Sequence, residues 1–388
     1  MARRIATGID IGTHQTKVVV VEEIVTPEGA SVHIIGTGMS ETQGLRHGYI
    51  VDPSDASASI IAAKRQAESI AKVPIKSAFL AVGGVSLDEI RASGETVISR
   101  ADQEITDLDM EKVLHEARMA GAPHFVNRKV LHEIPLEYRV DGSKTMGSPL
   151  GMKGTKLEGE FLFITCLSQH ADSLTLAVES ADIEVIDRMA SPLAGSYVTL
   201  TKDQKMKGCV LANIGAETVS LVVYDEGMPV STKVFPIGST NITDDLALGF
   251  KISLEDAERI KLGRLSGVMY PRKKVEDIIA QRFHTMFDLI DKHIKSLGRR
   301  GSLPAGIILT GGGAGQGTIS DIAKGRLNLP TRIADMKLSA DTKVRDATWA
   351  VAYGLALWGL TGDTDVPKKN IAAEFTRSAK KFLMQFMP

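Results

Sequence analysis

The sequence predicts an α/β fold built from two duplicated halves, with a small α+β unit inserted in the first half. The prediction rests on two similar segments that lie about half the chain length apart, Ile5 to Val21 and Gly208 to Asp225. Each has two apolar runs joined by a short turn that contains glycine, the pattern of a β-hairpin. In a third segment, Ala305 to Gly317, an aliphatic run leads into three consecutive glycines, and a helix is expected to begin at Thr318.

The two turns are candidate phosphate-binding loops. Backbone N–H groups exposed at such a turn form a concavity that suits an anion, and a phosphate is the usual occupant. Asp10, at the end of the first strand, is placed to hold a hydrated magnesium ion beside that phosphate. Taken alone, Gly8, Asp10 and Gly12 favour a plain edge hairpin with a turn glycine. The second turn, Gly215 to Thr218, and the glycine loop shift the balance towards phosphate binding.

Length and composition indicate an ordinary soluble globular protein of about two to four domains. Of the 388 residues 43% are hydrophobic and 24% are charged, and the net charge of −1 gives no reason to expect nucleic-acid binding. Cys166 and Cys209 each lie in an apolar run and are expected to be buried thiols of a cytoplasmic protein. The nine histidines lack paired metal-ligand spacing, which gives no support to a zinc site. The sequence shows neither an apolar signal region nor an uncharged apolar run of about twenty residues, so no membrane-spanning helix is expected.

The first half should continue with a strand at Ser31–Met39 and a turn and short strand at Leu45–Asp52. A helix is predicted from Asp52-Pro53, a favourable cap and first position, to about Lys72. A strand at Lys76–Val82 completes a β-β-β-α-β order. The apolar face of the helix is expected to contain Ile60, Ile61, Ala67 and Ile70.

The next segment predicts a compact inserted unit, because it has strand and helix periodicity of its own. Its expected parts are a strand at Leu87–Ile98, a helix at Thr106–Ala120 and a strand at Val130–Val140. The loop Ser148–Glu160 should then lead into a strand at Phe161–Leu167. The simpler alternative is a set of loops that decorate the first half.

The order of two phosphate hairpins followed by a glycine loop resembles the actin, sugar kinase and heat-shock chaperone ATPase superfamily. The resemblance implies an actin-like ATPase fold, in which two related halves close on ATP around a nucleotide cleft. The glycine loop, with Gly311, Gly312 and Gly313, would then lie against the base and ribose.

Two further segments are similar to motifs of the FtsA family, the bacterial cell-division homologues of actin. The first is SPLGMKGTKLEGE at Ser148–Glu160, and the second is PIGSTNITDDLALGFKISLEDAERIK at Pro236–Lys261. The resemblance covers essentially the whole chain. It implies ATP and Mg²⁺ as ligands, self-association into dimers or filaments, and binding of the C-terminal peptide of FtsZ to the smaller subdomain of the second half. It also implies a position on the cytoplasmic membrane surface at the division site.

The second half contains two helical features that bear on the site. Glu258 and Lys261 lie three residues apart on a predicted helix and therefore on one face, either as adenosine ligands, which the resemblance favours, or as an exposed ion pair. A long amphipathic helix is predicted at Val275–Ser296. The helix at Thr348–Leu360 is rich in small residues, which suits a tight helix crossing between the halves.

The C-terminal tail predicts a tether followed by an amphipathic helix. Residues 361–370 are polar and turn-rich, whereas 371–388 place bulky apolar residues on one stripe and basic residues beside it. Such a helix suits an anionic membrane surface, or it docks on the protein body or a partner; the resemblance favours the membrane. The candidate membrane residues are Phe375, Arg377, Lys380, Lys381, Phe382, Leu383 and Phe386.

The second turn departs from the superfamily pattern, which is close to D-I-G-G-G-T-T-D. Asn213 and Ser220 stand where the pattern has aspartates, and Ser191 precedes Pro192 where these enzymes often carry Glu or Gln. Glu217 adds a negative charge whose carboxylate could point outward, take a role beside the metal, or repel ATP. We therefore expect nucleotide binding with weak or no hydrolysis, and we assign no catalytic residue.

The favoured interpretation is an ATP-binding, actin-like division protein that polymerises on the membrane and anchors the FtsZ ring. A PilM-like assembly protein of the type IV pilus machinery is the alternative, and a sugar or acetate kinase is a third. The candidate nucleotide ligands are Gly12, Thr13, His14, Lys17, Gly215, Ala216, Glu217, Thr218, Gly238, Glu258, Lys261, Gly311, Gly312, Gly313, Ala314 and Gln316, with Asp10 for the metal. The expected domains are 1–82 with 161–200 and 345–360 for the first half, 83–160 for the inserted unit, 201–344 for the second half, 361–370 for the linker and 371–388 for the terminal helix.

Overall fold

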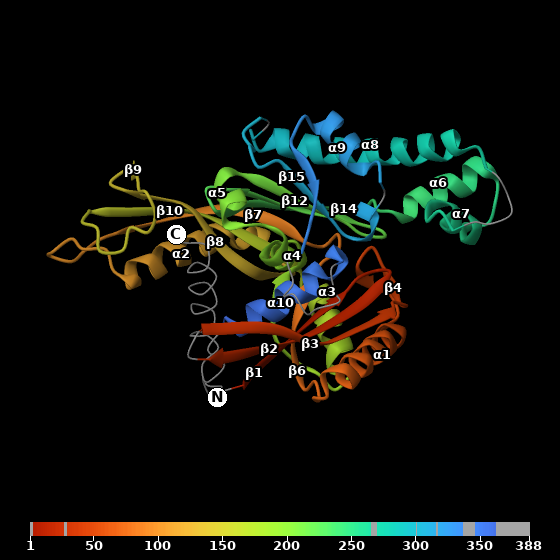
Figure 1. Ribbon diagram of the computed structural model, residues 1–388. Coiled ribbons are helices and arrows are strands. Elements are labelled where there is room, and N and C mark those ends of the chain that lie inside the picture. The colour runs from red at the N-terminus through yellow and green to blue at the C-terminus, as the bar shows by residue number, and fades with distance from the viewer. Residues whose placement is uncertain are drawn as a thin grey trace.

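The chain folds into two α/β halves with a smaller unit at one end, as Figure 1 shows. The computed structural model describes residues 3–26, 29–264, 270–299, 301–315, 317–336 and 346–361. The first-half sheet consists of β1 (Arg3–Ile11), β2 (Gln15–Thr26), β3 (Gly29–Glu41), β6 (Ser77–Val82) and β11 (Glu184–Ala190). The second-half sheet consists of β12 (Cys209–Ile214), β13 (Val219–Asp225), β14 (Met228–Phe235), β15 (Ile307–Thr310) and β16 (Thr331–Ile333).

The two sheets have the same topology. In the first, the strand order is β11-β6-β1-β2-β3, with β2 and β3 antiparallel and β6 and β11 parallel to their neighbours. In the second, the order β16-β15-β12-β13-β14 repeats these directions strand by strand. The halves are therefore structural duplicates, which confirms the predicted fold class.

Helices connect many of the strands along the chain. They are α1 (Pro53–Ala71), α3 (Ser168–Glu179), α4 (Ser191–Thr199), α5 (Lys202–Lys207), α6 (Thr240–Phe250), α7 (Leu254–Lys261), α8 (Arg272–Ser296), α9 (Ile319–Leu327) and α10 (Ala350–Leu360). Short 3₁₀ turns η2 (Gly312–Gly315) and η3 (Ala347–Trp349) precede α9 and α10, and the small strands β4 (Leu45–Arg46) and β5 (Tyr49–Ile50) precede α1. Within the described part of the chain, we find no helix with the length and apolar character needed to cross a membrane.

The helix α1 begins where its sequence predicts. Asp52 caps it, because its carboxylate accepts the backbone N–H groups of Ser54 at 2.9 Å and Asp55 at 3.1 Å. Ile60 is fully buried against the first sheet, but Ile70, which the apolar pattern also assigns to the buried face, is 53% exposed. That assignment was wrong, since Ile70 lies off the helix face that packs on β3.

The helices α4 and α10 cross at the centre of the molecule. A Cβ atom on Gly354 of α10 would lie 1.9 Å from the carbonyl oxygen of Ala194 in α4, so the backbones touch. Close by, the hydroxyl groups of Tyr224 and Ser196 lie 2.7 Å apart and link the second sheet to α4. One buried apolar cluster contains residues of both halves, which makes the halves parts of a shared core.

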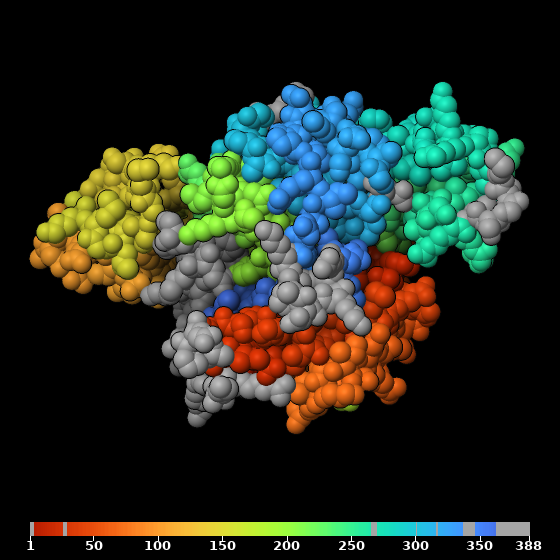
Figure 2. All heavy atoms as spheres, in the orientation of Figure 1, coloured from red at the N-terminus to blue at the C-terminus, as the bar shows by residue number. Residues whose placement is uncertain are grey.

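The inserted unit is a four-stranded sheet covered by one helix. Its elements are β7 (Asp88–Val97), α2 (Asp107–Gly121), η1 (Ala122–His124), β8 (Arg128–Val140), β9 (Ser143–Lys144) and β10 (Lys156–Leu167), with strand order β7-β10-β8-β9. The strand β10 starts at Lys156 rather than at Phe161, because Lys156 already pairs with β7 and residues 157–160 pair with both β7 and β8. Figure 2 shows this unit, coloured orange to yellow, projecting from one end of the molecule, opposite α6 and α7.

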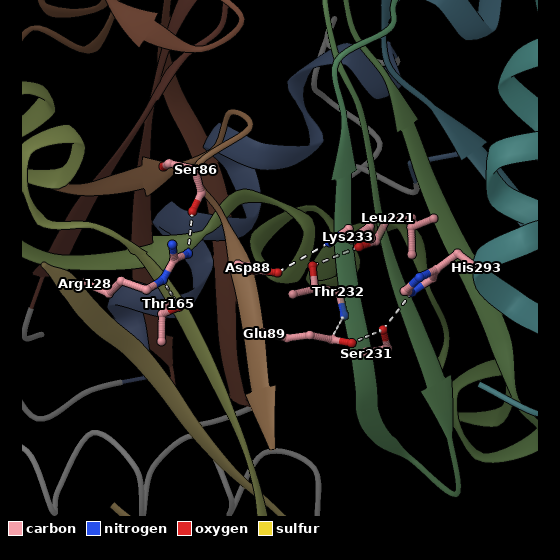
Figure 3. A network of polar contacts seen from close by, with 10 residues as sticks. All are labelled: Ser86, Asp88, Glu89, Arg128, Thr165, Leu221, Ser231, Thr232, Lys233 and His293. Atoms are coloured by element: carbon pink, nitrogen blue, oxygen red, sulfur yellow. Dashed lines mark hydrogen bonds and ion pairs between the residues drawn. The ribbon is translucent and has the colours of Figure 1, made fainter. Parts of the chain in front are cut away.

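Polar side chains join the inserted unit to the second half (Figure 3). The carboxylate of Glu89 on β7 accepts the N–H of Thr232 at 2.6 Å and the hydroxyl of Ser231 at 2.8 Å on β14. The hydroxyl of Ser231 also lies 2.8 Å from Nε2 of His293 on α8. Burial raises the pKa of Glu89, although these hydrogen bonds and nearby positive charges oppose the rise. Burial, with the charge of Lys233, lowers the pKa of His293 to about 4.

Candidate phosphate-binding site between the two halves

The two hairpin loops are built alike. The N–H of Gly12 donates to the carbonyl of Gln15 at 3.1 Å, and in the second loop the N–H of Gly215 donates to that of Thr218 at 2.8 Å. The next two backbone N–H groups of each loop bond to no acceptor among the described residues; they belong to Thr13, His14, Ala216 and Glu217. Adjacent N–H groups without acceptors are what an anion needs at a tight turn.

Asp10 and Lys17 lie opposite each other at the mouth of the first hairpin. The Asp10 residue is partly exposed, but the protein around its carboxyl group raises the pKa to about 6, against the effect of the Lys17 charge. Lys17 is buried, and its ammonium group donates to the carbonyl of Thr348 in η3 at 2.9 Å. Burial lowers the pKa of Lys17, while the charges of Asp10 and Asp346 oppose the shift.

The glycine loop lies on the end of strand β12. Asn213, the counterpart of Asp10 in the second half, pairs in register with Thr310 of β15. A Cβ on Gly311 would lie 2.2 Å from Oδ1 of Asn213, and the φ of Gly311 is +89°, so only glycine fits. A Cβ on Gly313 would meet Ile214 at 2.5 Å, whereas one on Gly312 would meet no described atom within 4 Å.

The second loop is fixed to the start of α6. Backbone N–H groups of Ser239 and Thr240 donate to the carbonyls of Gly215 at 2.9 Å and Ala216 at 2.8 Å. A Cβ on Gly238 would lie 2.2 Å from the carbonyl oxygen of Ala216, so the segment passes directly over the loop.

The ammonium group of Lys261 lies 2.6 Å from the carboxylate of Glu258 in an ion pair. Both side chains also form hydrogen bonds with Thr243 of α6. Lys261 donates to the hydroxyl of Thr243 at 2.8 Å and to the carbonyl of Ser239 at 3.2 Å. Partial burial opposes ionisation of Glu258, but hydrogen bonds from Lys261 and Thr243, with the charge of Lys261, outweigh it and lower the pKa of Glu258.

The side chain of Glu217, in the second loop, extends from the second half towards the first. Its carboxylate accepts the backbone N–H of His47, which lies in the turn between β4 and β5 of the first half. The Nδ1 atom of His47 lies 3.4 Å from the carbonyl oxygen of Glu217 and 3.8 Å from its carboxylate. The side chain is thus turned towards the first half.

The structure brings most of the predicted ligands to the junction of the two halves. Gln316 and the membrane residues Phe375, Arg377, Lys380, Lys381, Phe382, Leu383 and Phe386 lie outside the described residues, as does nearly all of the predicted linker. Sequence reasoning missed His47, Asp346 and Thr348. The His47-Gly48 dipeptide between two short apolar runs was a turn signal that could have indicated the first of these.

The residues present fit a nucleotide with a magnesium ion held largely by its phosphates. Free loop N–H groups suit phosphate oxygens, and Mg²⁺ commonly takes one or two carboxylates together with phosphates and water. In the described part of the chain, no group of three or more His, Cys, Asp or Glu residues could by itself hold a metal. Asp10 would be the carboxylate, whereas Asn213 and Ser191 at the ends of β12 and β11 offer no group that accepts a proton at neutral pH.

Comparisons with known proteins agree on one family. Residues 210–354 match the family model described as cell division protein FtsA, and residues 86–165 match the SHS2 domain inserted in FtsA. The cell division protein FtsA of Pseudomonas aeruginosa is 28% identical over 386 residues, which cover 93% of this chain and 91% of the relative. That of Bacillus subtilis is 30% identical over 369 residues, which cover 90% of this chain and 82% of the relative.

Solved structures show the same fold at lower sequence identity. The PilM-PilN type IV pilus biogenesis complex contains a chain with a TM-score of 0.68 and 17% identity, and the match covers 92% of this chain and 98% of that one. MreB5 of Spiroplasma citri bound to ADP has a TM-score of 0.52 and 14% identity, and the match covers 92% of this chain and 97% of the MreB5 chain. Together with the duplicated sheets, these matches make the fold actin-like.

Proposed function

Because the chain belongs to the FtsA family of cell division proteins, we propose that it binds ATP between its halves, assembles on the cytoplasmic membrane face and anchors the FtsZ ring. The observation that carries the nucleotide part is the pair of matching hairpin loops with free N–H groups. The membrane part is carried by the tail sequence, which combines aromatic and basic residues at helical spacing.

Each part of the site has a proposed role. Loop N–H groups would bind phosphate oxygens, Asp10 would hold Mg²⁺, and Lys17 would place positive charge beside the first loop. The bound metal would neutralise phosphate charge. The backbone of Gly311 to Ala314 would lie against the base and ribose, and Glu258 and Lys261 would face the adenosine.

Hydrolysis is proposed to be slow or absent. Phosphoryl transfer to water needs a side chain that orients the attacking water and a second carboxylate near the metal, besides that of Asp10. Asn213 does not supply this second carboxylate, and Ser191, which is 8% exposed, stands where the related enzymes often carry Glu or Gln. Purified protein with Mg²⁺ and ATP should release phosphate far more slowly than a kinase does.

The domain division belongs to the same proposal. Residues 1–82, 161–200 and 345–360 would form the first half, 83–160 the inserted unit, and 201–344 the second half with the site for the FtsZ peptide. Residues 361–370 would link this body to a membrane helix at 371–388. Each basic residue of that helix would add about 1 kcal/mol of attraction near an anionic surface.

Sedimentation with lipid vesicles tests the membrane function. The intact chain and a chain truncated after Asp365, which keeps all described residues, are spun with anionic or neutral vesicles, each with and without Mg²⁺ and ATP. We expect only the intact chain to sediment, to do so with anionic vesicles, and to sediment more fully with ATP as copies associate. Equal sedimentation of the truncated chain would overturn the proposal, and a Phe382→Ser variant provides a matched change within the tail.

Binding of peptides separates this function from the pilus alternative. The likeness to the PilM chain is at 17% identity and concerns the fold, whereas the relatives at 28% and 30% identity are cell division proteins. We expect the chain to bind the C-terminal peptide of FtsZ and not peptides of PilN, the partner named in the pilus complex. The reverse preference would favour the pilus function.

A further inference from the structure

The second hairpin loop sends an acidic side chain into the first half. Glu217 lies two residues after the loop glycine, the place that His14 has in the first loop. The carboxylate of Glu217 accepts the backbone N–H of His47 directly, so a residue of the second half binds the first.

The donor side of this contact, the turn at His47, is held in place by its neighbours. His47 and Gly48 both have positive φ, 50° and 84°, as a tight turn between two strands requires. A Cβ on Gly48 would lie 2.5 Å from Cα of Gly84, and the N–H of Val85 donates to the carbonyl of His47 at 3.4 Å. The turn is therefore packed on the chain that leaves β6, and it does not swing freely to follow Glu217.

The carboxylate of Glu217 thus lies where the first sheet meets the second loop. Strand β6 runs parallel to β1, so the chain beyond Val82 lies beside the first hairpin loop, and the His47 turn rests on that chain. If the two loops bind phosphates as proposed above, a terminal phosphate held by both loops would have to enter the same space. A diphosphate, which is shorter by one phosphate, would leave that space to the carboxylate.

We propose that Glu217 determines which nucleotide the site accepts, and that it makes a nucleoside diphosphate preferred over a triphosphate. This inference rests on the proposed nucleotide binding. A γ-phosphate would bring further negative charge next to a carboxylate that is held in place by His47, and like charges a few ångströms apart repel strongly in a partly buried site. The superfamily pattern, close to D-I-G-G-G-T-T-D, has glycine at this position, which carries no such charge.

Ligand affinities test the proposal directly. Binding of Mg²⁺-ADP and of a non-hydrolysable Mg²⁺-ATP analogue to the full chain is measured by calorimetry for the natural protein, Glu217→Gln and Glu217→Ala. We expect the natural protein to bind ADP at least about tenfold more tightly than the analogue, and both variants to reduce that ratio towards one. Glu226→Gln, an exposed residue in the turn between β13 and β14, is the control and should keep the ratio.

Two outcomes overturn the inference. If the natural protein binds the analogue as tightly as ADP, Glu217 does not discriminate. If Glu217→Gln weakens both ligands, Glu217 acts beside the metal instead. Failure of every variant to bind either nucleotide would refute the proposed nucleotide function itself, and the inference with it.

Hydrogen exchange provides a second readout that needs no ligand. In the nucleotide-free protein the His47 amide should exchange slowly, because Glu217 accepts it. Glu217→Gln keeps an acceptor oxygen and should retain most of the protection, whereas Glu217→Ala should lose it. Equal exchange of this amide in the natural protein and in Glu217→Ala would contradict the contact on which the inference depends.

Discussion

Equivalent residues in the two halves have different chemistry. The strand ends β1 and β12 share their backbone arrangement, but one carries Asp10 and the other Asn213. Lys17 is paired in register with Asp10, whereas Ser220 takes that place opposite Asn213. The charges that suit a metal and a phosphate are therefore concentrated on the first hairpin, and the second contributes mainly backbone N–H groups.

Replacing Lys17 should weaken both the site and the fold. In Lys17→Met the carbonyl of Thr348 loses its donor and Asp10 loses its compensating charge. We expect the free energy of unfolding to fall by roughly 1–3 kcal/mol and nucleotide affinity to fall by about tenfold or more, measured by denaturation and calorimetry. Lys207→Met, which removes an exposed ion pair with Asp203, should change stability by at most about 0.5 kcal/mol. Equal effects of the two variants would contradict the assigned role of Lys17.

His293 should make the protein sensitive to mild acid. Its pKa is about 4 in the folded chain and near 6.5 when unfolded, so only the unfolded chain takes up a proton between these values and stability falls as pH falls through them. His293→Gln removes this contribution to the pH dependence of stability. The stability difference between natural protein and variant should shrink by about 1 kcal/mol from pH 7.5 to 5, a figure reduced for the partial exposure of the ring. His284→Gln, exposed on the same helix, is the control, and a pH-independent difference would refute the prediction.

Sequence alone locates the hairpin loops because their signals are local. Each loop is defined by a few consecutive residues, and the structure shows the expected turns at Gly12 and Gly215. The direction of Glu217 is decided by His47, 170 residues away in the chain, and Lys17 is held by a carbonyl 331 residues away. Such contacts are set by the closure of one half on the other, which local patterns do not contain.

At the scale of elements, periodicity predicts helices better than strand ends. Helix α1 has the expected start because a cap and a proline mark it. The start of β10 was misplaced because Gly and Glu residues at 156–160 look like a loop, although pairing on both sides holds them in the sheet. Strand β14 was not predicted, because the polar residues Ser231 and Thr232 interrupt its apolar pattern. In the structure these two residues bind Glu89 of the inserted unit.

The crossing of α4 and α10 depends on a single glycine. In Gly354→Ala the added methyl group would lie 1.9 Å from the backbone of Ala194, so the helices must separate. We expect a loss of about 2 kcal/mol or more in the free energy of unfolding, although alanine favours the helix by about 1 kcal/mol. Denaturation in urea measures the change.

Gly325 offers a matched control for this substitution. It lies within α9, and a Cβ there would meet no described atom within 4 Å. Gly325→Ala should therefore stabilise the protein by roughly 0.5–1 kcal/mol through helix propensity alone. If Gly354→Ala were also stabilising, the helices would not be in backbone contact.

At the scale of the whole molecule, the buried apolar residues that the structure describes form three clusters with different roles. One is shared by the two halves, a second lies on the far side of the second sheet, and a third belongs to the inserted unit. The inserted unit meets the second half through polar contacts such as that of Glu89 with Ser231, and one face of its sheet, with Ile134 and Leu162, belongs to the cluster that the halves share. The proposed nucleotide site lies beside that shared cluster, whereas helix α2 packs on the third cluster. We therefore expect the α2 side of the inserted unit to loosen without disturbing the proposed site.

Matched core substitutions test this independence. Val113→Ala in the inserted unit and Val222→Ala in the shared core each remove buried methyl groups and should each cost roughly 1–3 kcal/mol locally. For Val113→Ala we expect faster hydrogen exchange in α2 and β7, unchanged exchange in β1 and β12, and nucleotide affinity within about twofold of the natural protein. Val222→Ala should speed exchange in both halves, because Val222 belongs to the core they share. Loss of nucleotide affinity in Val113→Ala would show instead that the inserted unit and the two halves act as one cooperative unit.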